Sequence, residues 1–225
     1  MQNGRVPLQN RVDPYGRLHA VGARGTLMGN RGVLHDASRR VVAAWRTRRW
    51  IACVLTFRGR HREVFAPRRY SELFFLDEAT ALSAGHRPCA ECRRARYEAF
   101  RAAWAAGNGR NGEAKPSADE MDRVLHRERV VSAPDAPRRV APLAALPPGT
   151  MVEVDGRPWL VRDGGLRPWS FGGYGPARRL PARTRVLVLT PGSIVRAMRA
   201  GFAPEAHESA KGSVPSRTGS QRERK

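Results

Sequence analysis

The sequence has only three cysteines in 225 residues. So small and odd a number excludes the disulfide framework that is typical of small secreted domains. A chain of this length buries enough apolar surface to fold without such cross-links. The sequence also lacks the run of about 18 apolar residues that a membrane span requires, and its polar N-terminal segment lacks the apolar stretch of a signal peptide. We therefore expect a cytoplasmic globular protein that does not enter a membrane.

Acidic residues are scarce relative to basic ones. Asp and Glu together number 20 against 41 Lys and Arg, which gives a formal net charge of +21. Almost all of the basic residues are arginine, whose planar guanidinium matches phosphate and stacks on bases. A GC-rich genome would also favour arginine codons, but such a bias does not explain the excess of base over acid. The charge therefore predicts a polyanionic partner, DNA or RNA.

Residues 1–130 are predicted to form an α+β domain. Short alternating or apolar runs bounded by Gly and Asn, typical of strands, occur between Gly16 and Leu76. Helices with recognisable boundary residues are predicted after them: 77–85 with Asp77 as cap, 89–107, and 117–130 with a capping box at its start.

The remainder of the chain is predicted to contain a second, smaller unit. Five prolines between 131 and 149 predict an extended linker. Residues 150–203 show strands separated by Asp-Gly turns, followed by a helix between Pro191 and Gly201. The segment 204–225 has too little apolar surface to fold and is predicted to be a disordered tail. The predicted fold class is thus α+β, with a small β-rich C-terminal module.

Cys89 and Cys92 form a Cys-x-x-Cys motif directly after Pro88. Two thiolates at this spacing can bind one Zn²⁺ at about 2.3 Å. A redox dithiol would require the strand-to-helix setting of a thioredoxin active site, which the flanking sequence lacks. The simplest alternative is that the two cysteines are merely small residues of the core and bind no metal. If they do bind zinc, a tetrahedral site needs two further ligands.

The segment FFLDEATALSAGHRPCAECRR resembles the second half of the N-terminal zinc domain of the Ada DNA-repair proteins, which accept a methyl group from DNA methylphosphotriesters. In that family a short helix rich in Glu and Ala leads through Gly and an aromatic residue to Arg-Pro-Cys-x-x-Cys. The resemblance covers residues 50–94. It implies that Cys89 and Cys92 are zinc ligands and that a basic helix start faces the DNA backbone. The basic residues in question are Arg87, Arg93, Arg94 and Arg96.

The sequence differs from the Ada family at the first pair of zinc ligands. Ada domains have a Cys-x-x-x-Cys further upstream, whereas here the upstream cysteine is Cys53 and the residue four positions after it is Phe57. The resemblance implies that Cys53 is the third ligand, although free cysteine also commonly fills a core. Histidine or water must supply the fourth ligand. His61 is the first candidate, followed by His35 and His86.

A second group of polar residues occurs in the segment ARGTLMGNRGVLHDASRR. Arg24 and Arg31 offer guanidinium forks for phosphate, and His35 with Asp36 could supply acid–base or metal chemistry. Asp36 capping a turn is the simpler alternative. His126 lies four residues after Asp122 on a predicted helix, a spacing that could orient the imidazole or merely form a surface ion pair. The candidate catalytic residues are therefore His35, Asp36 and His126.

Aromatic residues alternate with arginines in the C-terminal module. Trp169 and Tyr174 are the candidates for base stacking, because single-stranded nucleic acids bind to aromatic platforms surrounded by positive charge. A small barrel that uses these rings in its core is the alternative.

These patterns favour a zinc-containing nucleic-acid-binding protein that acts in DNA repair or DNA processing. One alternative is a metal-dependent DNA or RNA hydrolase or base-processing enzyme. Another is an Ada-like methyl-accepting sensor of DNA damage, in which Cys53 would be the acceptor thiolate.

Overall fold

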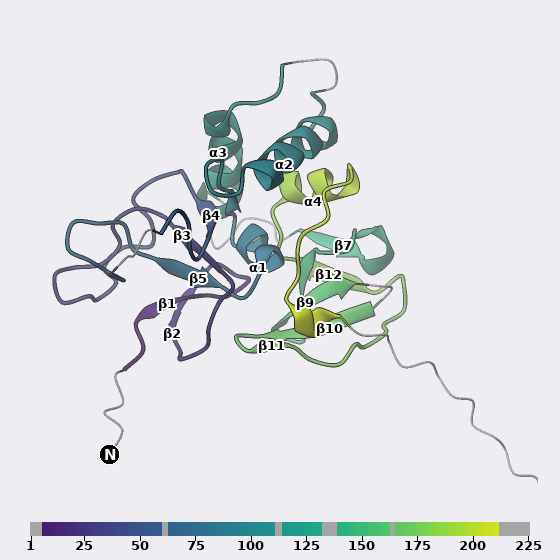
Figure 1. The fold of residues 1–225 in the computed structure, drawn as a ribbon. Coiled ribbons are helices and arrows are strands. Elements are labelled where there is room, and N and C mark those ends of the chain that lie inside the picture. Colours follow the sequence, from purple (N-terminus) through teal and green to yellow (C-terminus); the bar gives the residue numbers. More distant parts are fainter. Residues whose placement is uncertain (1–5, 60–62, 111–113, 132–138, 163–164, 212–225) are drawn as a thin grey trace, which may run out of the picture.

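A computed structural model describes residues 6–59, 63–110, 114–131, 139–162 and 165–211. Two six-stranded sheets flank helix α1 (Glu78–Ser83), and three further helices lie above them (Figure 1). About 25% of the chain is helical and 25% is in strands, so the fold is α+β as predicted. No helix in the described part of the chain is long and apolar enough to span a bilayer.

The first sheet has the strand order β2-β1-β5-β3-β4-β6. Its strands are β1 (Gln9–Val12), β2 (Leu18–Ala20), β3 (Leu27–Asn30), β4 (Ile51–Val54), β5 (Leu73–Phe75) and β6 (Arg87–Pro88). Strand β4 runs antiparallel to β3 and parallel to β6. Gly29 allows this packing, because a Cβ there would lie 2.3 Å from the backbone oxygen of Ile51.

The predicted helices form with the predicted boundary residues. Asp77 caps α1, and the box of Ser117 and Glu120 caps α3 (Ala118–His126). The helix predicted over 89–107 begins only at Arg94 as α2 (Arg94–Gly107), because the preceding residues form a turn around the two cysteines. After α3 the chain continues as a π-helix, η1 (Arg127–Val131).

The second sheet has the order β11-β10-β9-β8-β12-β7. Its strands are β7 (Val140–Pro142), β8 (Met151–Val154), β9 (Arg157–Arg162), β10 (Gly165–Ser170), β11 (Gly173–Tyr174) and β12 (Arg185–Val188). The Asp155-Gly156 turn joins β8 to β9 as predicted, and both of its residues have positive φ.

The segment predicted as a linker contributes to this sheet instead. Strand β7 pairs with β12, and a 3-10 turn, η2 (Leu143–Ala145), follows it. Leu143 and Leu146 are buried in the core of the second sheet. Proline is tolerated here because β7 is an edge strand. Of the predicted linker, 132–138 lie outside the described residues.

The helix predicted to close the C-terminal module, α4 (Gly192–Arg199), packs against α2 of the first part. Ile194 and Met198 are buried in one cluster with Phe100 and Trp104. An amphipathic helix packs where its apolar stripe finds a matching surface, and α2 supplies one. The two predicted domains therefore share a helical core.

Residues 203–211, the C-terminal strap, return between the two sheets instead of forming the first part of a disordered tail (Figure 1). The backbone nitrogen of Glu205 donates to the Glu78 carboxylate (2.9 Å), and that of His207 donates to Asp77 (2.9 Å). The 3-10 turn η3 (Glu208–Ala210) buries Ala210 against the second sheet. Residues 212–225 of the predicted tail lie outside the described residues.

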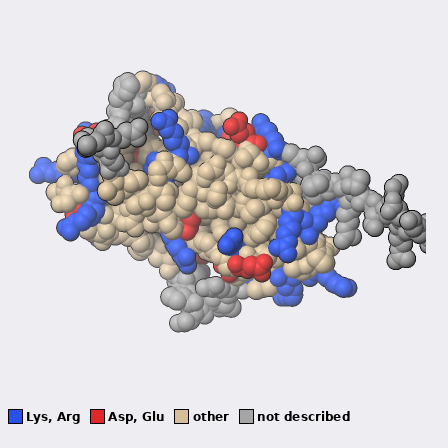
Figure 2. All heavy atoms as spheres, turned by 90° about the horizontal axis from the view of Figure 1, so that it is seen from below, with Lys and Arg blue, Asp and Glu red and all other residues tan. Residues whose placement is uncertain are grey.

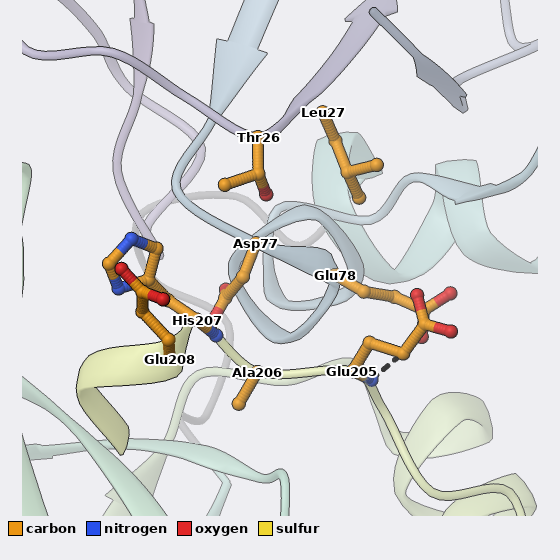
Figure 3. A pocket seen from close by; sticks show the side chains of 8 residues that line it. All are labelled: Thr26, Leu27, Asp77, Glu78, Glu205, Ala206, His207 and Glu208. Atoms are coloured by element: carbon orange, nitrogen blue, oxygen red, sulfur yellow. Dashed lines mark hydrogen bonds between the residues drawn. The ribbon is translucent and has the colours of Figure 1, made fainter. Parts of the chain in front are cut away.

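The strap and the start of α1 line a cavity of about 380 Å³ (Figure 3). One of its buried carboxylates, Asp77, accepts hydrogen bonds from the backbone nitrogen and hydroxyl of Thr80, from the Tyr174 hydroxyl (2.8 Å) and from the backbone nitrogen of His207. The Asp77 carboxylate thus ties α1, the second sheet and the strap together.

Candidate metal centre

Three cysteines meet at the edge of the first sheet. Cys53 lies in β4, whereas Cys89 directly follows β6 and Cys92 lies three positions further on. The pairing of β4 with β6 brings these distant segments together, and the backbone nitrogen of Cys89 donates to the oxygen of Ala52 (3.0 Å). The three sulfur atoms lie within 4.8 Å of one another. Thiolates on one tetrahedral zinc ion are roughly 3.8 Å apart, so this cysteine site could hold a metal ion.

The turn after Cys89 is shaped for an anionic sulfur. The backbone nitrogen of Glu91 donates to the Cys89 Sγ (3.4 Å), and that of Arg93 donates to the Cys89 oxygen (3.2 Å). The Glu91 N–H stabilises a thiolate at Cys89, because it places partial positive charge beside the sulfur, whereas the Arg93 N–H closes the turn.

The thiols perturb one another. A hydrogen bond from Cys53 lowers the pKa of Cys89 to about 5; burial opposes this shift, and backbone N–H groups support it. The same hydrogen bond, together with burial, raises the pKa of Cys53 well above its ordinary value. Burial also raises the pKa of Cys92. One thiolate is therefore already favoured at neutral pH, and a metal ion would displace the remaining thiol protons.

Apolar side chains pack around the cysteine site. Met28 is buried in one cluster with Cys53 and Cys89, and Ile51, Tyr70 and Phe74 pack against this cluster. Cys53 and Cys89 are buried, whereas Cys92 is only partly buried. The site therefore combines a low-dielectric interior with one ligand near the surface.

The candidates for a fourth ligand differ in position. His35 is occupied, because its Nδ1 bonds to the Ser71 hydroxyl (2.7 Å) and its Nε2 to the Ala66 oxygen (3.2 Å). His86 is fully buried on the opposite side of β4, between Phe75 and Trp50. Neither belongs to the cysteine group, which is the one potential metal cluster among the described residues. His61 lies outside the described residues.

The candidate catalytic residues do not share a contact. Asp36 caps a turn, since its carboxylate accepts from the backbone nitrogens of Ser38 (2.9 Å) and Arg40 (3.0 Å). His35 is stacked on Phe65 with a centroid distance of 4.5 Å. His126 instead meets Trp45 edge-on, with a centroid distance of 4.5 Å. His35 and Asp36 therefore have their own hydrogen-bond partners, and His126 has a ring contact with Trp45 at a separate position.

Three of the four predicted DNA-facing arginines form ion pairs with carboxylates of other elements. Arg87 is 4% exposed and forms a two-pronged ion pair with Asp122. Arg93 pairs with Glu78 (2.9 Å), and Arg96 pairs with the same carboxylate. Arg94 differs, because its side chain is 71% exposed beside Glu98. The two pairs with Glu78 anchor the start of α2 to α1.

The two aromatic candidates of the C-terminal module also have internal partners. The Trp169 indole nitrogen donates to the Thr80 hydroxyl (3.0 Å), and Tyr174 is 7% exposed with its hydroxyl on Asp77. Both rings thus join the second sheet to α1. This position agrees with the alternative in which these aromatic residues belong to the core.

Sequence reasoning missed another basic segment. Residues 45–49 carry the exposed side chains of Trp45, Arg46, Arg48 and Arg49 directly before β4. The sequence WRTRRW interleaves arginine with tryptophan, and this pattern could have indicated a nucleic-acid-binding segment. The apolar residues on both sides of it led to a prediction of strands.

Comparisons with protein-family models, curated proteins and solved structures found no match.

Proposed function

We propose that the protein binds zinc through Cys53, Cys89 and Cys92 and uses the region built on this site to bind nucleic acid, in DNA repair or DNA processing. The main support for zinc binding is that three thiols from two distant segments lie close together. The main support for nucleic-acid binding is the net charge of +21. The resemblance of residues 50–94 to the Ada zinc domain supports the same ligands. Zinc at this site would cross-link β4 to the turn that starts α2.

The zinc site would also position a basic surface. The segment 45–49 leads directly into β4, so fixing β4 restricts the exposed Arg46, Arg48 and Arg49. Arg94 is exposed two residues after Cys92. Arginine interleaved with an exposed Trp45 supplies both phosphate contacts and a stacking ring.

Positive charge is not restricted to this segment. Figure 2 shows one face of the molecule, on which Lys and Arg are spread around the periphery and are more numerous than Asp and Glu. Such a distribution supports binding that is mainly electrostatic and tolerant of sequence.

The local hydrogen bonds of His35 and Asp36 favour binding over hydrolysis, since both side chains already hold the loop in place. Cys53 is 8% exposed, which favours a ligand over a methyl acceptor that DNA must reach. The proposed role of the metal is therefore structural.

Metal analysis tests the proposal. We expect one zinc per chain as purified, and its loss in Cys89→Ser and in Cys53→Ser together with a large fall in melting temperature, because structural zinc contributes directly to folding. His61→Ala tests the fourth ligand, with His207→Ala as the matched control that should retain zinc. Purified protein that contains no metal and whose melting temperature is unaffected by Cys89→Ser would refute the zinc site.

A further inference from the structure

A second site lies on the opposite side of β4 from the cysteines. It is a cavity of about 250 Å³, here called the arginine pocket, between the first sheet and η1. Its walls include Tyr15, Trp45 and Trp50, and its charged lining residues are Arg31 and Arg129. The volume is close to the lower end of the roughly 300–1,000 Å³ that is typical of small-molecule sites.

Arg31 is held rigidly with one nitrogen unused. The residue is 3% exposed, and its guanidinium lies 4.2 Å from the Trp50 ring. Its Nη1 donates to the Gly16 oxygen (2.9 Å), and its Nε approaches the His86 Nε2 (3.4 Å). Its buried Nη2 has no hydrogen-bond acceptor among the described residues.

Arg129 reaches the same cavity from the π-helix. Its Nη1 donates to the Leu189 oxygen (3.2 Å), and its Nη2 is likewise buried without an acceptor in the described part of the chain. Gly85 makes room for the side chain, because a Cβ there would lie 2.6 Å from the Arg129 Cγ. π-helical turns are often found at functional sites.

The two unused nitrogens converge. A Cβ on Gly16 would lie 3.2 Å from the Arg129 Nη2 and 3.5 Å from the Arg31 Nη2. Gly16 has a φ of +85°, so glycine is favoured there on conformational grounds as well. Both guanidinium groups therefore border one small space beside a backbone that carries no side chain.

The charges in this space are only partly compensated. Burial lowers the pKa of Arg31 to about 9, with a further contribution from Arg129, while Asp13 acts in the opposite direction. Burial lowers the pKa of Arg129 to about 10. Both groups still carry a full charge at neutral pH. The Asp13 carboxylate itself is bonded elsewhere, to His19 (2.8 Å) and to the backbone nitrogen of Arg17 (2.9 Å).

Two adjacent guanidinium groups whose unused donor atoms are buried are costly unless an anion joins them. Phosphate suits this geometry, because each guanidinium can donate to a separate oxygen. The cavity extends beyond the arginines to Trp45, which is 39% exposed and can therefore stack on a planar group. We propose that the arginine pocket binds a mononucleotide, with its phosphate between Arg31 and Arg129 and its base against Trp45. The ligand is a free nucleotide or the phosphorylated end of a nucleic acid.

Calorimetry with adenosine monophosphate, inorganic phosphate and adenosine tests this proposal on the full-length protein. We expect the monophosphate to bind, inorganic phosphate to compete with it, and adenosine to bind at least about tenfold more weakly, because it lacks the group that the arginines contact. Adenosine binding as tightly as its monophosphate would overturn the proposal, as would the absence of binding by the monophosphate. This comparison needs no variant.

Variants then locate the site. Arg129→Gln should weaken binding of the monophosphate at least about tenfold, whereas Arg183→Gln, at an exposed arginine before β12, should leave it unchanged. Trp45→Ala should weaken binding of the monophosphate about fivefold or more and spare inorganic phosphate. Unchanged affinity in a folded Arg129→Gln protein would refute the site.

Two further comparisons complete the test. An oligonucleotide with a terminal phosphate that displaces the monophosphate, while its unphosphorylated form does not, would assign the ligand to a nucleic-acid end; failure of both would assign it to the free nucleotide. The inference does not depend on the zinc proposal, because nucleotide affinity and metal content are measured separately.

Discussion

Arg87 and Asp122 form a buried two-pronged ion pair. The Arg87 Nε lies 2.7 Å from one carboxylate oxygen of Asp122, and its Nη2 lies 2.8 Å from the other. Their side chains are 5% and 2% exposed. The pair joins β6, which directly precedes Cys89, to α3. It thus holds the cysteine turn against the helical core.

Removing one partner of this pair should be costly. We expect Asp122→Asn to lower the free energy of unfolding by about 3–5 kcal/mol, because the Arg87 charge would remain buried without its counterion. The matched control is Asp119→Asn, which breaks the exposed pair with Arg123 on the same helix and should cost less than about 1 kcal/mol. Urea unfolding of both variants measures the difference, and equal effects would show that the buried pair is not important.

The Asp77 carboxylate should hold the C-terminal strap. We expect Asp77→Asn to lower stability by at least about 2 kcal/mol, because an amide nitrogen would replace an oxygen that accepts hydrogen bonds in a buried site. Hydrogen exchange of residues 203–211 should also accelerate. Glu208→Gln changes an exposed carboxylate of the same cavity and should have neither effect. Unaltered exchange in Asp77→Asn would contradict this role.

His86 should make the protein acid-sensitive. Burial, followed by the charges of Arg31 and Arg129, lowers the pKa of His86 well below its ordinary value. Below about pH 6.5 the unfolded chain binds a proton at this position and the folded chain does not. Stability is therefore lost as the pH falls below that value, by up to about 1.4 kcal/mol per pH unit. It is unaffected by this group at higher pH.

The variant His86→Gln separates this contribution from those of other groups. Its stability should decline less steeply than that of the wild type between about pH 6.5 and pH 5. Chemical unfolding across this range measures both slopes. Parallel slopes would mean that His86 does not titrate differently in the two states.

Nucleic-acid binding should depend strongly on salt and on the segment 45–49. Each neutralised phosphate contributes about −0.7 to −0.9 to the slope of log affinity against log salt. Replacing Arg46, Arg48 and Arg49 together by Gln should reduce the magnitude of this slope by about 2–3 for DNA or RNA.

The matched control replaces three exposed arginines of the second sheet region. These are Arg157, Arg183 and Arg185. Fluorescence anisotropy at several salt concentrations compares the two triple variants. If the control variant shows the larger reduction in the salt slope, the nucleic-acid interface lies at the second sheet instead. If the wild type does not bind nucleic acid at low salt, the nucleic-acid proposal is refuted.

The helices were predictable because their signals are local. Asp77 before α1, the capping box of Ser117 and Glu120, and Gly201 after α4 act within one helical turn of their positions. The Cys-x-x-Cys turn and the Asp155-Gly156 hairpin are equally local. The linker prediction for 131–149 was wrong where β7 forms, because proline at a sheet edge has the same sequence signature as proline in an extended loop.

The sequence by itself determined the excess of positive charge, the class of the fold, the helix ends and the Cys-x-x-Cys spacing of Cys89 and Cys92. Only the tertiary structure decided which arginines face solvent. Arg87, Arg93 and Arg96 follow the basic pattern of an exposed helix start, yet they meet Asp122, Glu78 and Glu205 from distant parts of the chain. Arg31 and Arg129 are separated widely in sequence and border one cavity. The sequence shows which residues are charged, but whether a charged side chain is buried, and which counterion it meets, depends on which segments pack together.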